Sequence, residues 1–461
     1  MERELVGLLG LAALFVLLAL RIPVGLAMVG TGIGGAYALS WVAPQLRFEP
    51  YLAQFKTLLW TSVANYELSV VPLFVLMGYL AAHANLSRDL FQGVNALMGR
   101  VRGGVAMAAI GACAGFGAVC GSSLATASTM GRVALPELRR LHYAPSLATG
   151  TLAAGGTLGI LIPPSVALVL YAIVVEASII QMFQAAIVPG VIAVLLFLAV
   201  IAATVRLHPE RAPELEDLDH DAQRLAIRRL LPVVLIFGAI VLGLGMGLFT
   251  PTPAAGVGVF AILGYGFYLQ RQGDGLSLAG LRQSILKTAV TSSMIYFILF
   301  GAEILKGFFA RSGLPAALAS WAATSGLDPW LLLVLLLVSL IILGCLLESL
   351  SMILVIVPFF WPVLIELNGG EYTSAAGAAF GLDTGELKIW FGILALVVVE
   401  LGLITPPVGL NLLVISALAE DGSMRDTVRG VLPFFGVELV RIGLLLLVPG
   451  LALYLPRLLA G

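Results

Sequence analysis

Two proline pairs inside apolar segments are the residues of this chain whose types and spacing most clearly predict chemistry. Each pair begins four positions after a glycine: Gly159 precedes Pro163-Pro164, and Gly402 precedes Pro406-Pro407. Proline has no backbone N–H to donate, and it disfavours helical geometry at the residue before it. In hydrocarbon, each carbonyl freed in this way costs several kcal/mol unless it finds a partner. That partner is either a neighbouring helix or water, or a bound cation.

Oxygen-bearing residues around each proline pair predict two sodium sites, because hard cations prefer oxygen ligands. The first site is predicted from three carbonyl groups and a facing hydroxyl: Gly159, Ile162 and Pro164 with Ser122 or Ser123. The second is predicted from the corresponding residues of the second half: Gly402, Thr405 and Val408 with Glu348, Ser349 or Ser351. The first site needs no ionisable group, which favours sodium over proton coupling. The alternative interpretation is a pair of kinks whose carbonyls are satisfied by packing.

Small polar side chains near the breaks are candidates for hydrogen bonds to a substrate, with polar contacts between helices as the alternative. They are Thr126, Thr157, Ser351 and Asn411. Glu348 lies inside an apolar stretch, where an unpaired carboxylate is costly, so we expect a functional role for it. Its alternative is a hairpin-tip residue that reaches interfacial water. Glu400 is either functional in the same way or part of a scaffold contact.

The composition indicates an all-α polytopic membrane protein that must position these residues within a bilayer. Of the 461 residues, 60% are hydrophobic and 11% are charged, against about 25% charged in a soluble domain. The net charge of −1 argues against nucleic acid as a partner. The chain has no phosphate-binding loop of the Gly-x-x-x-x-Gly-Lys-[Ser/Thr] type and no motif of a membrane-embedded hydrolase. We therefore expect no ATP-driven step, no enzymatic activity and no catalytic residues.

Apolar segments of about 20 residues predict plain membrane spans. These are residues 5–20, 23–42, 69–83, 182–205, 230–249, 254–270, 288–310 and 432–456, with connecting segments at 46–68 and 271–287. Two further spans, about 147–175 and 388–418, contain the proline pairs and are predicted to be broken. Two stretches, about 103–137 and 329–365, are too long for one crossing and are predicted to be re-entrant helical hairpins.

The charge distribution predicts two halves of opposite orientation. Basic residues flank the first hairpin on both sides (Arg100 and Arg102 before it, Arg139 and Arg140 after it), so both of its ends are predicted to be cytoplasmic. Continuing this alternation places both termini in the periplasm and inverts residues 230–461 relative to residues 1–205, with 206–229 as a charged cytoplasmic linker. Such an inverted repeat with broken helices is typical of secondary transporters, whose sites lie near the midplane.

Short sequence echoes support this repeat. Gly117 in the first predicted hairpin corresponds to Gly344 in the second. Gly159 before the first proline pair corresponds to Gly402 before the second. The match predicts that each hairpin faces the broken helix of its own half.

Three segments carry a resemblance to a known family: residues 118–137, residues 155–165 with the first proline pair, and residues 390–411 with the second. Over essentially its whole length the chain resembles the large membrane subunit of tripartite ATP-independent periplasmic (TRAP) transporters. It departs from the family pattern at Pro253, where glutamate is common, and in a longer loop at 369–385.

The resemblance implies a sodium-driven importer of organic acids, such as C4-dicarboxylates or sialic acids, in a bacterial inner membrane. It implies two partners, a small four-helix membrane subunit and a periplasmic substrate-binding protein. It also implies an elevator mechanism, in which hairpins and broken helices move against a scaffold, and it places the sodium sites on the residues named above. The alternative is a stand-alone secondary transporter of related fold that needs no binding protein.

Overall fold

The computed structural model of the chain describes residues 2–213, 220–345, 347–419 and 423–459. The described residues contain no strand, and 83% of them are helical. In the described part of the chain, eight helices are long and apolar enough to cross a membrane, or nine if the bent pair α8–α9 counts as one span. The prediction of an all-α polytopic membrane protein is confirmed.

The helices of the first half follow the chain in this order: α1 (Glu2–Ala19), α2 (Val24–Val42), α3 (Phe48–Val63), η1 (Tyr66–Ser69), α4 (Val70–His83), α5 (Leu86–Met98), α6 (Gly104–Cys120), α7 (Ser123–Arg140), α8 (Pro145–Leu161), α9 (Val166–Val174), α10 (Ile179–Leu207) and η2 (Pro209–Arg211). Those of the second half are α11 (His220–Gly245), α12 (Pro251–Arg271), α13 (Leu278–Ser312), α14 (Leu314–Thr324), α15 (Pro329–Gly344), α16 (Ser349–Leu367), η3 (Ala375–Gly377), α17 (Thr384–Leu403), α18 (Leu410–Leu418), α19 (Met424–Leu447) and α20 (Gly450–Leu459).

Side-chain caps define several of these helix starts. The carboxylate of Asp328 accepts hydrogen bonds from the first N–H groups of α15, and the hydroxyl of Ser277 does the same for α13. Ser423 and Asp426 form a reciprocal capping box at the start of α19. Helix α13 ends before Gly313, whose positive φ of 72° suits glycine.

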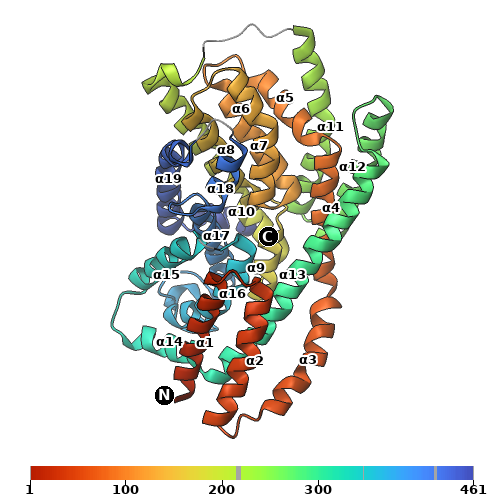
Figure 1. Cartoon of the computed structure of the whole chain (residues 1–461). Helices are drawn as coiled ribbons and strands as arrows, with labels where there is room; N and C mark the ends of the chain where they lie inside the picture. Colours follow the sequence, from red (N-terminus) through yellow and green to blue (C-terminus); the bar gives the residue numbers. More distant parts are fainter. Residues whose placement is uncertain (1, 214–219, 346, 420–422, 460–461) are drawn as a thin grey trace.

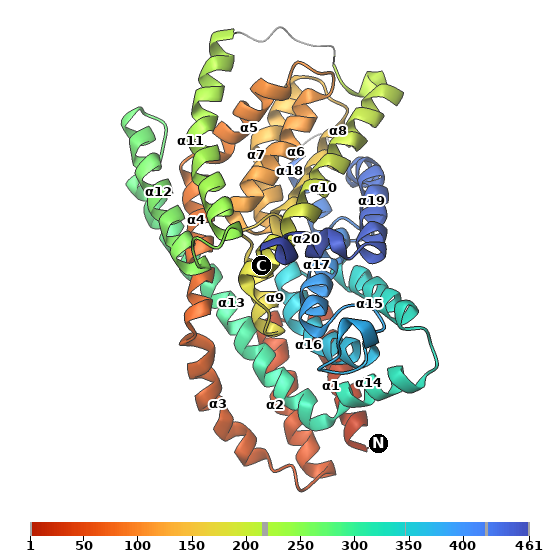
Figure 2. The ribbon, with the colours of Figure 1, turned by 180° about the vertical axis from the view of Figure 1, so that it is seen from behind.

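Two groups of helices build the molecule (Figure 1). The outer frame consists of α1–α4 and α11–α13, with the long α13 running diagonally beside α2 and α4. The inner body consists of α6–α10 and α15–α20. Two short helices connect these groups, α5 between α4 and α6 and α14 between α13 and α15. Figures 1 and 2 show α5 and α14 at opposite ends of the molecule.

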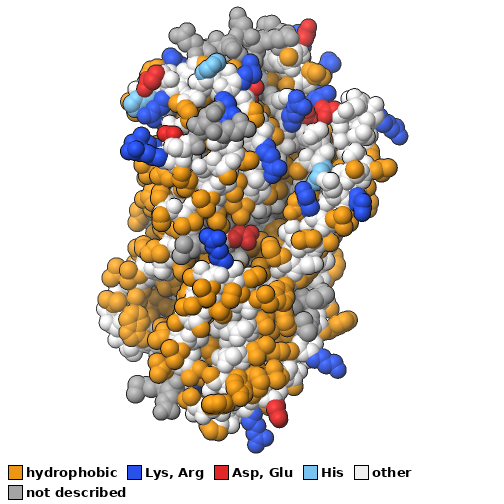
Figure 3. Space-filling model, viewed as in Figure 1, with side chains coloured by type: hydrophobic (Ala, Val, Ile, Leu, Met, Phe, Trp, Pro, Cys, Tyr) orange, Lys and Arg blue, Asp and Glu red, His pale blue; other side chains and the backbone are white. Residues whose placement is uncertain are grey.

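The surface separates charge from apolar side chains along the long axis. In Figure 3, most Lys, Arg, Asp and Glu side chains lie in the upper part of the molecule and a few at its lower end. Some basic and acidic side chains also lie at mid-height, but hydrophobic side chains dominate the zone between the ends. A belt of this kind suits the hydrocarbon core of a bilayer, which is about 30 Å thick.

Helix pairs occur where the sequence predicts hairpins and broken spans. The segment 103–137 forms α6 and α7, and 329–365 forms α15 and α16. The segments 147–175 and 388–418 form α8–α9 and α17–α18, and α8 and α9 are bent by 46° at their break. The division of the chain into inverted repeats at 1–205 and 230–461 remains a prediction.

Part of the predicted charged linker is helical and paired. Residues 220–229 belong to α11, where Arg229 lies 3.5 Å from Asp89 of α5 and 3.1 Å from Asp274 in the α12–α13 loop. Asn85 donates to the same Asp274 at 2.8 Å. These contacts therefore join α5, α11 and the α12–α13 loop.

One predicted span was wrong, and both predicted connecting segments are partly helical. The predicted connecting segment 46–68 contains helix α3, and the predicted connector 271–287 includes the first turns of α13. The span predicted at 432–456 breaks between α19 and α20, because Pro449 disfavours helical geometry at Val448. As a result α20 folds back against α10 and α17 and lies at mid-height in both views (Figures 1 and 2).

Candidate ion and substrate site

The first break leaves helix carbonyls without helical donors. Helix α8 ends at Leu161, and α9 begins at Val166, where the Ser165 hydroxyl accepts a hydrogen bond from the third residue of the new helix. Because residue 163 is proline, it cannot donate to the carbonyl of Gly159 four positions earlier. Ile162 lies in extended geometry just after the helix, and the peptide bond between the two prolines is cis.

The tip of the first hairpin lies directly against this break. A Cβ atom added to Gly159 would be 2.4 Å from Thr126 Oγ1 and 2.7 Å from the carbonyl oxygen of Ser122. A Cβ added to Gly117 would be 2.6 Å from Gly159 Cα. Gly121, at the tip, has a φ of 57°, and a Cβ there would be 2.9 Å from the backbone nitrogen of Val166. Glycine is required at these positions so that two backbones can approach each other.

The second half repeats this contact. A Cβ added to Gly402 on α17 would be 2.7 Å from Gly344 Cα at the end of α15. The Thr405 hydroxyl donates to the Leu401 carbonyl at 2.6 Å, and the same carbonyl accepts from the Ile404 backbone N–H at 3.2 Å. The contact of Gly344 with Gly402 thus corresponds to that of Gly117 with Gly159, as the sequence echoes predict.

The two breaks differ in exposure. Pro163 and Pro164 are buried, whereas Pro406 and Pro407 are exposed, and Thr405 and Val408 are half-buried. In the second hairpin, Glu348 is half-buried and begins α16 without a side-chain cap bond, and Ser349 and Ser351 are buried.

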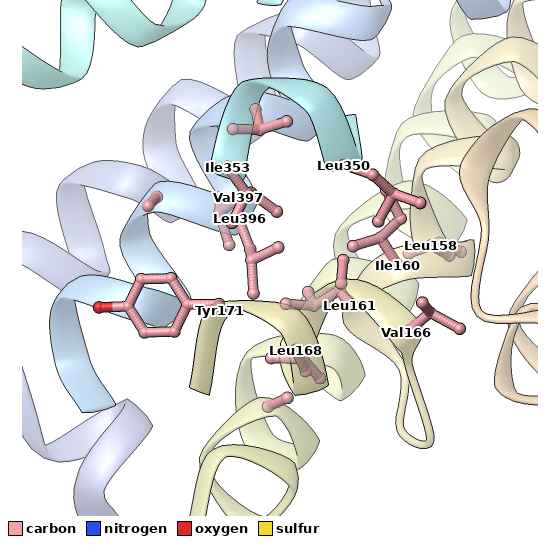
Figure 4. Close-up of a cluster of buried hydrophobic side chains, with 14 of the residues drawn as sticks. Leu158, Ile160, Leu161, Val166, Leu168, Tyr171, Leu350, Ile353, Leu396 and Val397 are labelled. Atoms are coloured by element: carbon pink, nitrogen blue, oxygen red, sulfur yellow. The ribbon is translucent and has the colours of Figure 1, made fainter. Parts of the chain in front are cut away.

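Each break also sends its outgoing helix to the other half. Helix α9 packs on α16 of the second hairpin, and α18 packs on α7 and α8. Figure 4 shows the region of the first contact: Leu161, Val166 and Leu168 at the first break belong to one cluster of buried hydrophobic side chains with Leu350 of α16 and Leu396 of α17. The apolar cluster therefore ties the first break to the second hairpin and its broken helix.

The predicted polar side chains have protein partners. The Ser122 hydroxyl caps α7 by accepting from Ala125 N at 3.4 Å, and the Ser123 hydroxyl donates to the Thr157 carbonyl at 3.4 Å. Thr126 Oγ1 lies 2.9 Å from Cys120 Sγ. The contacts of Ser122 and Thr126 lie within the hairpin tip, and that of Ser123 joins the tip to α8.

Two more of the predicted substrate-binding side chains, Thr157 on α8 and Asn411 on α18, also have protein partners. The Thr157 hydroxyl donates to the Ala154 carbonyl at 2.7 Å, and the Asn411 amide donates to the Ala153 carbonyl at 3.3 Å. Thr126, Thr157, Ser351 and Asn411 are each at most 2% exposed. In this conformation the four side chains are enclosed by the packed helices.

A cavity of about 100 Å³ does lie at the tip of the first hairpin. Its polar lining combines Ser122 and Thr129 of the hairpin with Tyr79 of α4 and Thr291 of α13. Tyr79 and Thr291 are joined by a hydrogen bond of 2.9 Å between their hydroxyl oxygens. Sequence reasoning missed Thr129, Tyr79 and Thr291. The only sequence signal for Thr129 is its place one turn beyond Thr126 on α7.

A buried ion pair is the second feature that sequence reasoning missed. Glu400 of α17 lies 3.5 Å from Arg441 of α19, and both side chains are 1% exposed. Arg441 also bonds Glu438, three residues earlier on the same helix. The signal was an Arg and a Glu at i, i+3 spacing inside an apolar span, which is unusual in a membrane.

Comparison with known proteins places the chain. Residues 11–451 match the model of the tripartite ATP-independent periplasmic transporter DctM component. The C4-dicarboxylate TRAP transporter large permease DctM of Pseudomonas aeruginosa is 31% identical over 92% of this chain and 93% of its own length. The sialic acid TRAP transporter large permease SiaM of Vibrio cholerae is 30% identical over 87% of this chain and 88% of its own.

The fold has a distant match among solved structures. The YdaH transporter of Alcanivorax borkumensis superposes with a TM-score of 0.56 at 15% identity, and the match covers 85% of this chain and 87% of that one. That likeness concerns the fold alone. Since the family match spans nearly the whole sequence, the chain belongs to the DctM family of TRAP transporters and is a transporter permease subunit, not an enzyme.

Proposed function

We propose that the chain imports a small organic acid across a bacterial inner membrane, driven by a sodium gradient. It works with a small four-helix membrane subunit and with a periplasmic binding protein that delivers the substrate. The relatives named for C4-dicarboxylates and sialic acid support an organic acid as the substrate class.

The observation that carries the proposal is the pairing of a hairpin with a broken helix in each half. In the first pair, the carbonyl of Gly159 has lost its helical donor and the carbonyl of Ser122 lies close by. The described residues hold no group of three His, Cys, Asp or Glu side chains that could bind a metal. A donor set of carbonyl and hydroxyl oxygens suits sodium.

The elevator part of the proposal rests on the boundary between the outer frame and the inner body. The cavity of Ser122, Thr129, Tyr79 and Thr291 lies at this boundary, with two hydroxyls from each side. Hydroxyl groups there would donate to a substrate carboxylate. Movement of the inner body along α4 and α13 would then carry the substrate and the ions together.

Uptake in reconstituted vesicles tests the sodium proposal. With both membrane subunits and a loaded binding protein, we expect substrate accumulation only under an inward sodium gradient. Potassium in place of sodium, at equal ionic strength and membrane potential, is the control. Accumulation at the same rate in potassium would refute sodium coupling. Accumulation by this chain alone, without the other two proteins, would favour the stand-alone alternative.

The hairpin tip offers a matched pair of serine variants. Ser122→Ala removes a hydroxyl that caps α7 and lines the cavity, and we expect it to weaken the sodium dependence of uptake without unfolding the chain. Loss of a cap costs about 1 kcal/mol, well within the stability of a folded domain. Ser128→Ala, on the same helix, removes a hydroxyl that bonds only the Ala125 carbonyl and should leave uptake unchanged. Equal sodium affinities in both variants would remove the Ser122 side chain from the ligand set.

A further inference from the structure

The cavity formed by Ser122, Thr129, Tyr79 and Thr291, which we call the hydroxyl cavity, has no charged residue in its described lining. Hydroxyl groups donate equally well to a carboxylate and to the oxygen of a neutral alcohol or amide. The lining of the cavity therefore binds oxygen atoms without selecting for charge, and selection for an acid needs a cation nearby.

Lys287 brings a positive charge to the frame side of the hydroxyl cavity. It lies four residues before Thr291 on α13, so the two side chains share one face of that helix. Its Nζ lies 5.9 Å from the centroid of the Tyr79 ring, which is a cation–π distance. Since Tyr79 and Thr291 bond each other, the ammonium group is held beside two residues that line the cavity.

Arg132 has the corresponding place on the hairpin side. It lies three residues after Thr129 on α7, again on the same helix face. Its Nε donates to the Ser128 carbonyl at 3.3 Å, one turn back toward the hairpin tip. Helix α7 ends and α13 begins in the upper part of Figure 1, so Lys287 and Arg132 lie toward the same end of the cavity.

Neither of these cations has an acidic partner in the described part of the chain. Lys287 and Arg132 form no ion pair there with an Asp or a Glu. By contrast, Arg140 at the end of α7 pairs with Glu137 at 2.9 Å. The charges of Lys287 and Arg132 therefore remain available to an anion that is not part of this chain.

We propose that Lys287 and Arg132 are the charge-selecting residues of the transport path, and that they attract the carboxylate of the organic acid at the end of the hydroxyl cavity. Lys287 belongs to the outer frame and Arg132 to the inner body, so both sides of the boundary attract the same group. The hydroxyls then orient an anion that the two cations admit. The inference rests on the proposed import of an organic acid and adds the residues that distinguish an anion from a neutral molecule.

Thiol modification measures this charge selection without transport. Thr129→Cys places a thiol in the lining of the hydroxyl cavity, where an anionic and a cationic methanethiosulfonate of similar size compete for it. The wild-type chain, whose three cysteines are buried, gives the background rate. Adding Lys287→Met or Arg132→Met should lower the ratio of the anionic to the cationic rate by at least about threefold, because loss of one positive charge acts on the two reagents in opposite directions.

Arg282→Met is the matched control for the thiol experiment. Arg282 is exposed on α13, five residues before Lys287 and on another face of the helix, so its removal should leave the rate ratio unchanged. Unchanged ratios in both Lys287→Met and Arg132→Met would overturn the proposal and leave the two residues as interfacial cations that contact lipid headgroups. An equal fall in Arg282→Met would also overturn it, because the effect would then come from the general charge of the surface.

Uptake distinguishes this proposal from the proposed function. With succinate as the probe, Lys287→Met should slow uptake by at least about fivefold, and Lys287→Arg, which keeps the charge, should retain most of it. Equal losses in the two variants would show that the shape of the lysine matters and not its charge, which contradicts the proposal. A wild-type chain that takes up no succinate would count against the proposed substrate class, and the thiol ratios would still decide the charge selection.

Discussion

Replacing Arg441 with Met is expected to lower the free energy of unfolding by about 3–5 kcal/mol, the usual cost of removing one partner of a buried ion pair. Among the described residues, Arg441 is the single cation paired with Glu400 and Glu438, and its side chain is 1% exposed. Met fills a similar volume but carries no charge, so most of the expected loss comes from the carboxylates left unpaired. Thermal unfolding of the purified chain, followed by size-exclusion chromatography, measures the effect.

Arg457→Met is the matched control for this substitution. Arg457 bonds Glu386 at 2.7 Å, but its side chain is 52% exposed. A solvent-exposed ion pair of this kind contributes about 0–1 kcal/mol. Equal losses of melting temperature in the two variants would show that burial does not set the value of the Arg441 pair.

Replacing Gly159 with Ala is expected to reduce uptake by at least about tenfold, which corresponds to about 1.4 kcal/mol in a rate or binding constant. The new methyl group would lie 2.4 Å from Thr126 Oγ1 and 2.7 Å from the Ser122 carbonyl oxygen, so the hairpin tip must move away from the break. The oxygens proposed to bind the first sodium ion would then separate. Sodium-driven uptake and the sodium concentration for half-maximal rate are the measurements.

The second half allows the same experiment. Gly402→Ala places a methyl group 2.7 Å from Gly344 Cα, and we expect a comparable loss. Gly436→Ala, in α19, is the control because a Cβ there meets no atom within 4 Å. Wild-type sodium affinity in both Gly159→Ala and Gly402→Ala, with folding intact, would mean that the two contacts do not form the ion sites.

The sequence was informative wherever a local rule applied. Proline removes a helical donor and disfavours helical geometry at the residue before it. The breaks after Leu161 and Leu403 therefore follow from the positions of the proline pairs in the sequence. Charged residues on both sides of an overlong apolar stretch led to the pair α6–α7, and the matched glycines led to the contacts of Gly117 with Gly159 and of Gly344 with Gly402. The same local reasoning missed α5 and α14, because short connecting helices lack an apolar run of membrane length.

The sequence by itself therefore determined the membrane class, the family, and the places where helices break, since each depends on the types and spacing of residues near one another in the chain. Only the tertiary structure decided which groups meet across the breaks. It paired Glu400 with Arg441, 41 positions later, and Tyr79 with Thr291, and it sent α9 and α18 to the opposite half. These contacts depend on helix packing between distant segments, where any apolar face of suitable shape can serve as a partner, so no local pattern specifies them.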